Sequence, residues 1–276
     1  MKVNELLNVE VTDLAVGGQA IARHEGRVVF VDRGLPGDRI DAQIRRVHRR
    51  YAEARLVRIQ ADSPLRVPAP CPHVTQCGGC RFQDLEYSEQ CRTKTRMVRE
   101  ALAHLGGLTD PPVEDIVPAP SVFGYRNKME FAFHPDPNGK PILGLHERGA
   151  FDRVFALETC LLCSELTREV VRYTQRFATE HQWRAYHARQ HQGVVRFLTV
   201  RHLPHTDQCA VHLIAAKPEI PGLEAWGQGI PALSAAVRTV SVAHNAWRSN
   251  VAQGEDERVL HGDGVVVERL LGLEFE

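Results

Sequence analysis

The sequence predicts an α+β protein in which a small N-terminal β-barrel precedes a mixed central domain. Residues 8–60 hold five short runs of alternating apolar and polar residues, separated by the turn-forming stretches GG, EG and LPGD. Such alternation is typical of strands with one buried face. Five strands in so short a segment fit a closed barrel of the OB type, because closure leaves no exposed sheet edge.

Beyond the barrel, two proline-rich stretches at residues 62–72 and 109–121 mark boundaries. Between them the sequence predicts a helix ending at Gly106 and Gly107, with one apolar face made of Met97, Val98, Ala101, Leu102 and Leu105. We therefore expect three parts: the barrel over residues 1–62, a linker with a cysteine loop and a helix over residues 63–110, and the central domain over residues 111–276.

The central domain is predicted to be a mixed sheet covered by one or two helices. Strand-like runs occupy residues 125–135 and 142–157, and four more follow residue 193. Between these groups, residues 164–182 carry apolar residues at helical spacing, and Ser164 is placed to cap the first turn of a helix. The alternation of strands and helices fits an α+β domain.

Bulk composition excludes several classes of protein. Lys plus Arg and Asp plus Glu number 34 each, so any nucleic-acid-binding surface must be local. The N-terminus lacks the pattern of a secretory signal, and no apolar run is long enough to span a membrane. We therefore expect a cytoplasmic protein without a membrane partner, whose seven cysteines are metal ligands or buried residues rather than disulfides.

Two clusters of basic residues are candidates for RNA contact. The fourth and fifth barrel strands carry Arg45, Arg49 and Arg50, which either track phosphates or simply keep a sheet edge solvated. A second cluster consists of Arg126, Asn127 and Lys128, followed by Phe131. Its phenylalanine either stacks on a base or faces the core, and the core is the commoner place for such a side chain.

Three cysteines, Cys71, Cys77 and Cys80, fall within the ten residues CPHVTQCGGC. Three thiolates with a fourth from elsewhere suit zinc or an iron–sulfur cluster. One ligand set pairs the last two with Cys160 and Cys163, as in a zinc ribbon, and the other joins all three to one distant cysteine. Buried structural thiols are the remaining alternative.

Four ordered motifs carry a resemblance that spans nearly the whole chain. These are CPHVTQCGGCRFQDLEYSEQ, YRNKMEFAF, LGLHERGAFDRVFALETCLL and the final VAQGEDERVLHGDGVVVERLLGLEFE. Together they resemble the RNA uracil-C5 methyltransferases of the TrmA/RumA type, and the barrel resembles their TRAM domain. The resemblance implies a 4Fe–4S cluster held by Cys71, Cys77, Cys80 and Cys160, and it raises the expectation that Arg126 and Lys128 contact RNA.

In that family a domain that binds S-adenosylmethionine follows the last of these motifs. We therefore expect a truncated chain that recognises RNA, ribosomal rather than transfer RNA, and that presents a uridine to a catalytic domain absent here or supplied separately. Such a chain has no catalytic residue of its own, does not methylate alone and does not bind DNA. The alternatives are a stand-alone RNA-binding adaptor and an iron–sulfur redox or electron-transfer protein.

Overall fold

The computed structural model describes residues 1–248 and 250–276, which form two compact units. The first unit contains Met1–Val74 and Cys80–Pro120, and the second contains Thr75–Gly79 and Ser121–Glu276. The separate region that we predicted over residues 63–110 thus belongs almost entirely with the barrel. Its short segment Thr75–Gly79 instead belongs with the second unit.

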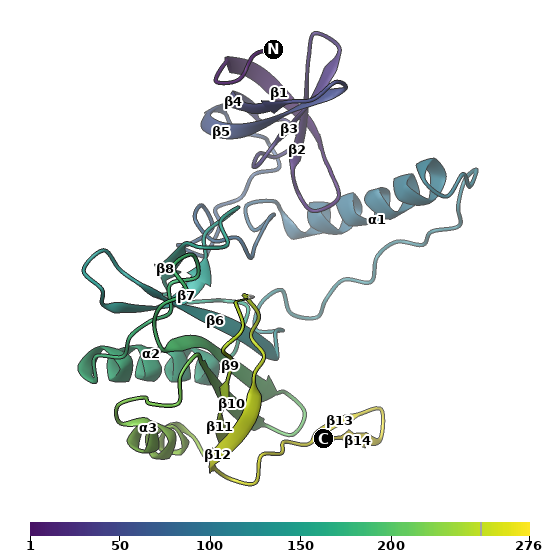
Figure 1. Cartoon of the computed structure of the whole chain (residues 1–276). Helices are drawn as coiled ribbons and strands as arrows, with labels where there is room; N and C mark the ends of the chain where they lie inside the picture. The colour runs from purple at the N-terminus through teal and green to yellow at the C-terminus, as the bar shows by residue number, and fades with distance from the viewer. Residues whose placement is uncertain (249) are drawn as a thin grey trace. The chain divides into compact units, whose positions relative to one another are not determined.

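The first unit is built on a closed five-stranded barrel, as the sequence predicted (Figure 1). The strands follow the order β1-β2-β3-β5-β4, in which β3 and β5 run parallel and the other pairs antiparallel. Their inward side chains are mainly valine, isoleucine, leucine and alanine, which fill the small interior. The strand bounds are β1 Leu6–Leu14, β2 Ala20–His24, β3 Arg27–Val31, β4 Arg39–Val47 and β5 Tyr51–Ala61.

A buried ionic network holds the proline-rich segment after β5 against the barrel. Asp38 is completely buried and accepts hydrogen bonds from the backbone N–H groups of Leu35 and Ser63, at 2.6 and 2.8 Å. Its carboxylate also pairs with Arg66, which in turn pairs with Asp84. Burial by itself would lower the pKa of Arg66, but its two carboxylate partners raise it overall.

Helix α1, Tyr87–His104, ends close to the predicted glycine pair but buries different residues from those we expected. Its buried side chains are Thr93 and Thr95, and Met97 packs partly against the barrel core. Val98, Leu102 and Leu105 of the predicted apolar face are exposed, and Ala101 is half-buried. The residues that α1 buries are therefore those that contact the rest of the first unit, and they are not the residues of its apolar stripe.

The second unit is a seven-stranded sheet in the order β12-β11-β10-β9-β6-β7-β8. All neighbours are antiparallel except β10 and β11. A separate hairpin of β13 and β14 closes the chain. The strand bounds are β6 Lys128–Pro135, β7 Pro141–His146, β8 Val154–Ala156, β9 Val195–Leu203, β10 Gln208–Ala215, β11 Val237–His244, β12 Glu255–His261, β13 Glu268–Leu270 and β14 Leu273–Phe275.

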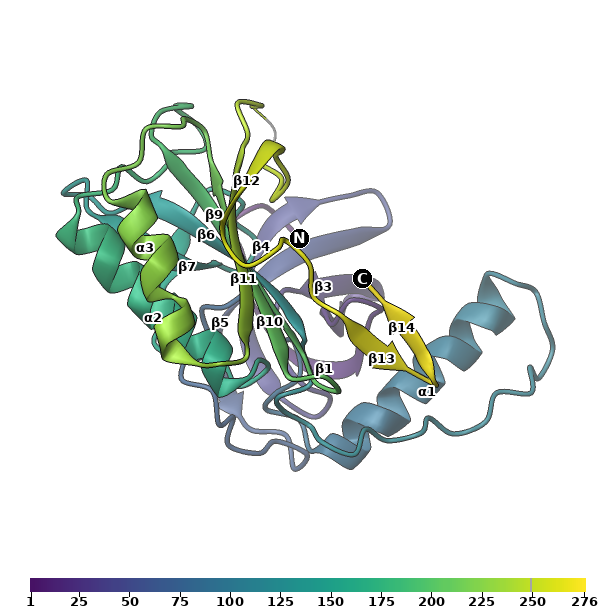
Figure 2. The same ribbon diagram turned by 90° about the horizontal axis from the view of Figure 1, so that it is seen from below.

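Two helices, α2 (Glu165–Glu180) and α3 (Leu223–Gly229), lie on one face of this sheet (Figure 2). The Ser164 hydroxyl accepts a hydrogen bond from the Thr167 N–H at 3.2 Å, which confirms the predicted helix cap. The two helices are joined where the Trp226 indole N–H donates to Thr174, at 3.1 Å, inside the core. The predicted mixed sheet with covering helices is therefore confirmed, and within the described residues no helix is long and apolar enough to cross a membrane.

Candidate nucleic-acid interface

Two hairpins meet at one end of the barrel and gather its basic residues there. The β4–β5 hairpin presents Arg45, Arg49 and Arg50, all of which are exposed, as the sequence led us to expect. The neighbouring β2–β3 hairpin presents Arg23, which is also exposed. The pairing of β3 with β5 places Val28 opposite Tyr51, so the two hairpins lie side by side.

Arg27 fastens these two hairpins together. Its guanidinium donates from Nη2 to the backbone carbonyl oxygens of His48 and Arg49, at 2.5 and 3.4 Å. The β4–β5 hairpin is closed by the His48 N–H, which donates to the Tyr51 carbonyl oxygen at 2.9 Å. The exposed arginines are consequently carried on a turn whose backbone is anchored at several points.

Aromatic rings accompany the arginines at this end of the barrel. The rings of His48 and Tyr51 are stacked, with centroids 4.3 Å apart and an interplanar angle of 20°. Phe30 meets Tyr51 edge to face at a centroid distance of 5.5 Å. Glu53 contacts the Nε2 atom of His48 at 2.9 Å and so fixes the rotation of the imidazole ring.

Four of the arginines at this end are not paired with a carboxylate, although Arg46 pairs with Glu53 at 3.9 Å. Among the described residues, Arg23, Arg45, Arg49 and Arg50 take part in no ion pair. Unpaired, exposed guanidinium groups attract phosphate, and their bidentate geometry matches its oxygens. Cations beside aromatic rings are the pattern of surfaces that bind single-stranded nucleic acid.

The second predicted cluster divides between surface and core. Arg126, Asn127 and Lys128 are exposed, and Lys128 pairs with Glu130 at 2.7 Å. Phe131, in contrast, is completely buried in β6, which lies between β9 and β7. The structure therefore does not bear out the prediction that Phe131 contacts RNA, because its ring has no access to solvent.

Two of the predicted metal ligands, Cys71 and Cys80, lie in the first unit. The Gln83 side chain forms a hydrogen bond with each of these two residues. The Gln83 amide donates from Nε2 to the Cys80 sulfur at 3.4 Å, and its Oε1 atom accepts from the Cys71 N–H at 3.1 Å. This glutamine orients the two ends of the loop and supplies a polar contact to one thiol.

The remaining predicted ligands, Cys77 and Cys160, are buried in the second unit. The Gly79 N–H donates to the Cys77 sulfur at 3.3 Å. A hydrogen bond from Cys163 is the largest of the effects that lower the pKa of Cys160 to about 6, and the same contact raises the pKa of Cys163. Cys160 is thus the thiol of this pair that ionises more readily, and the thiolate is the form that binds metal.

No group of three or more histidine, cysteine or acidic side chains is arranged to hold a metal ion within the described part of the chain. The four predicted cysteines are divided between the two units, and that ligand set stays a prediction. The thiol chemistry of the individual cysteines is compatible with it.

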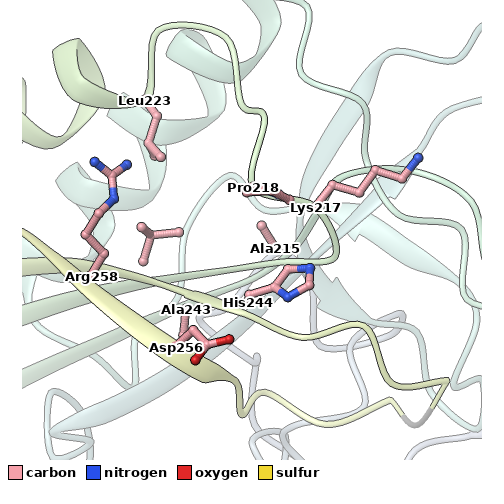
Figure 3. Close-up of a pocket in the computed structure, with 9 residues that line it drawn as sticks. Ala215, Lys217, Pro218, Leu223, Ala243, His244, Asp256 and Arg258 are labelled. Atoms are coloured by element: carbon pink, nitrogen blue, oxygen red, sulfur yellow. The ribbon is translucent and has the colours of Figure 1, made fainter.

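A cavity of about 420 Å³ lies where β10, β11 and β12 approach the start of α3 (Figure 3). Much of its lining is apolar, and two of its four polar side chains are engaged with the protein. Arg258 pairs with Glu224 at 2.5 Å, and the His244 Nε2 atom contacts the Ala216 carbonyl oxygen at 2.8 Å. In Figure 3 the Lys217 ammonium points away from the cavity. The cavity therefore offers few polar groups to orient a ligand, and the basic end of the barrel is the stronger candidate.

Sequence reasoning missed four residues of that end: Arg27, Phe30, His48 and Tyr51. The run RRVHRRY at residues 45–51 held a usable signal, because aromatic residues interleaved with arginines are typical of nucleic-acid-binding surfaces. The contribution of Arg27 and Phe30 could not be read in the same way, since it depends on which strands are neighbours in the barrel.

Comparisons with known proteins find a TRAM domain in this chain and relatives that are named as RNA methyltransferases. Residues 1–57 match the family model of the TRAM domain. A relative from Nitratidesulfovibrio vulgaris, named as an uncharacterized RNA methyltransferase, is 35% identical over 276 residues, which cover 98% of this chain and 58% of the relative. One of the same description from Gloeobacter violaceus is 31% identical over 272 residues, covering 98% of this chain and 59% of the relative.

A solved structure also shares the fold. It is the Pyrococcus abyssi tRNA (uracil-54, C5)-methyltransferase in complex with S-adenosyl-L-homocysteine, with a TM-score of 0.71 and 21% identity, covering 97% of this chain and 58% of that chain. This chain thus spans about three fifths of the length of the proteins it matches. The alignments do not support the predicted truncation or the predicted absence of a catalytic domain, so neither prediction is carried further.

Proposed function

Because the chain is a homologue of proteins named as RNA methyltransferases along nearly its whole length, we propose that it serves the methylation of uracil C5 in RNA. Its part in this reaction is to bind and orient the RNA substrate. The observation that carries the proposal is the basic and aromatic end of a TRAM barrel, on which four exposed arginines have no carboxylate partner among the described residues. S-adenosylmethionine supplies the methyl group in such a reaction.

The arginines of the barrel hold the phosphate backbone by charge-assisted hydrogen bonds, which position RNA without reading its sequence. Arg126 and Lys128 provide a second set of exposed cations on the other unit. Contacts of this kind keep a target uridine within reach while it leaves its stack, which any enzyme acting on a base requires.

The proposal is tested by binding of the purified chain to ribosomal RNA fragments, transfer RNA and duplex DNA of matched length. RNA should bind more tightly than DNA, and the affinity should fall steeply as salt rises from 50 to 200 mM, because counterions are released from the phosphates. Equal affinity for RNA and DNA would overturn it. We expect ribosomal RNA to bind better than transfer RNA, and the same titrations compare the two.

We also propose that Cys71, Cys77, Cys80 and Cys160 ligate a 4Fe–4S cluster. The proposal rests on the C-x5-C-x2-C motif, and it is supported by the N–H···S contact at Cys77 and by the lowered pKa of Cys160 beside Cys163. A structural cluster of this kind would stabilise the chain, and methyl transfer itself requires no redox step.

Anaerobic purification followed by iron and acid-labile sulfide analysis tests the cluster. About four irons and four sulfides per chain are expected. Cys160→Ser should lower the iron content, whereas Cys91→Ser on α1 should leave it unchanged and serves as the matched control. Zinc without labile sulfide, or equal iron loss in both variants, would contradict the ligand set.

A further inference from the structure

The stacked side chains of His48 and Tyr51 form a surface that can extend by one more ring. The imidazole lies over the phenol ring on one side, and the His48 side chain is 37% exposed. Phe30 meets Tyr51 edge to face, so both rings are held in place by neighbours. A further planar group therefore finds its stacking partner already oriented and loses little conformational entropy by binding there.

The backbone around this stack is equally well held. Arg27 fastens the carbonyl oxygen of His48, Glu53 fixes the ring nitrogen, and the Tyr51 carbonyl oxygen closes the turn. Immediately beside the stack, Arg49 and Arg50 are exposed and unpaired among the described residues. One short hairpin thus offers a ring face held in place by its neighbours and two exposed cations.

We propose that the His48 ring accepts the face of an unpaired RNA base, while Arg49 and Arg50 hold the flanking phosphates. A base inside a duplex has both faces covered by its neighbours in the stack, so only a base in a loop, a bulge or a single strand can use this surface. A duplex would meet only the arginines. The barrel therefore prefers single-stranded RNA over a duplex of equal charge.

This inference rests on the proposed function for the identity of the polymer as RNA, but its geometry is independent of any methyl transfer. The chemistry is that of a stacking platform beside cations, which tolerates any base because every base has a π-face. Discrimination between bases is accordingly expected to be weak, and discrimination between paired and unpaired strands is expected to be strong.

The test measures the affinity of the full chain for an unstructured RNA oligonucleotide and for a duplex RNA with the same total number of phosphates, at one fixed salt concentration. His48→Ala should weaken binding of the single strand about 5- to 150-fold, the range for loss of one aromatic stacking partner. Binding of the duplex should change less than about twofold. His48→Phe keeps a ring at this position and should restore most of the single-strand affinity.

Arginine variants separate stacking from charge. Arg49→Ala should weaken single strand and duplex alike and should reduce the slope of log affinity against log salt by about 0.7 for the single strand. Arg39→Ala is the matched control, because Arg39 is an exposed arginine at the opposite end of the same strand, β4. It should leave both affinities unchanged.

Three results would overturn the inference: equal losses for single strand and duplex in His48→Ala, failure of His48→Phe to restore binding, or absence of nucleic-acid binding by the unmodified chain. Single-stranded DNA distinguishes this inference from the proposed function. If DNA binds as tightly as RNA with the same dependence on His48, the stacking surface stands and the RNA methylation role fails. If RNA is preferred over DNA but His48→Ala binds RNA normally, the stacking surface fails and the proposed role in RNA methylation stands.

Discussion

Removal of the Asp38 carboxylate should destabilise the barrel unit and leave the stability of the second unit unchanged. In Asp38→Ala, the backbone N–H groups of Leu35 and Ser63 lose their acceptor, and Arg66 loses one of its carboxylate partners. All three residues are buried or nearly so, which prevents water from replacing the lost contacts. The variant therefore leaves two buried donors unsatisfied and a buried cation partly uncompensated.

The magnitude follows from these losses. An unsatisfied buried donor costs about 1–3 kcal/mol, and breaking a buried ion pair costs about 3–5 kcal/mol. The two effects overlap because the same carboxylate makes all the contacts, and Asp84 still pairs with Arg66. We therefore expect the free energy of unfolding of the barrel to fall by about 3–5 kcal/mol.

Asp62→Ala is the matched control. Asp62 also pairs with Arg66, at 3.0 Å, but its side chain is 69% exposed. Removal of an exposed partner of this kind costs less than about 1 kcal/mol, because water screens the pair. The two variants thus compare a buried and an exposed carboxylate on the same guanidinium.

Hydrogen exchange of peptides from β1 to β5 measures the effect in the full chain. Asp38→Ala should speed exchange of the slowest barrel amides by roughly two to four powers of ten, which is the kinetic equivalent of that free energy. All three tryptophans lie in the second unit, so tryptophan fluorescence during urea unfolding should stay unchanged. Equal exchange in the Asp38 and Asp62 variants would refute this reasoning.

Three further predictions concern acid stability, a helix cap and a buried thiol. The hydrogen bond from Asn8 is the largest effect on Asp41 and, with Arg58 and Gln60, outweighs burial, so its pKa lies below the usual 3.8. The ionised Asp41 carboxylate therefore stabilises the fold above pH 3.8, and this stabilisation is lost as the pH falls through the folded-state pKa. The urea midpoint of Asp41→Asn should accordingly change less with acid pH than the midpoint of the unmodified chain. Ser164→Ala removes the N-terminal cap of α2 and should lower the free energy of unfolding of the second unit by about 1 kcal/mol. Urea unfolding followed by tryptophan fluorescence measures this loss, and an unchanged urea midpoint would contradict a stabilising role of the cap. Burial raises the pKa of Cys209 to about 12, so alkylation at pH 8 should proceed roughly a thousandfold more slowly in the folded chain than in urea, and comparable rates would count against its burial.

The order of elements could be predicted from the sequence because it depends on local periodicity. Alternation with period two indicated the five barrel strands, and the helical spacing after Ser164 indicated α2 together with its cap. The exposed arginines of the β4–β5 hairpin were also predicted correctly as a basic surface. These features depend on residues close together in the chain, so a single pattern contains the relevant information.

Tertiary structure alone decided which side chains meet. The helix α1 buries Thr93 and Thr95 rather than its apolar stripe, and Phe131 lies in the core rather than at an interface. The anchoring of His48 by Arg27 requires the β2–β3 hairpin to lie beside the β4–β5 hairpin, which follows from the parallel pairing of β3 with β5. Local periodicity tells which face of a strand is apolar, but it contains no information on which strand or helix will cover that face.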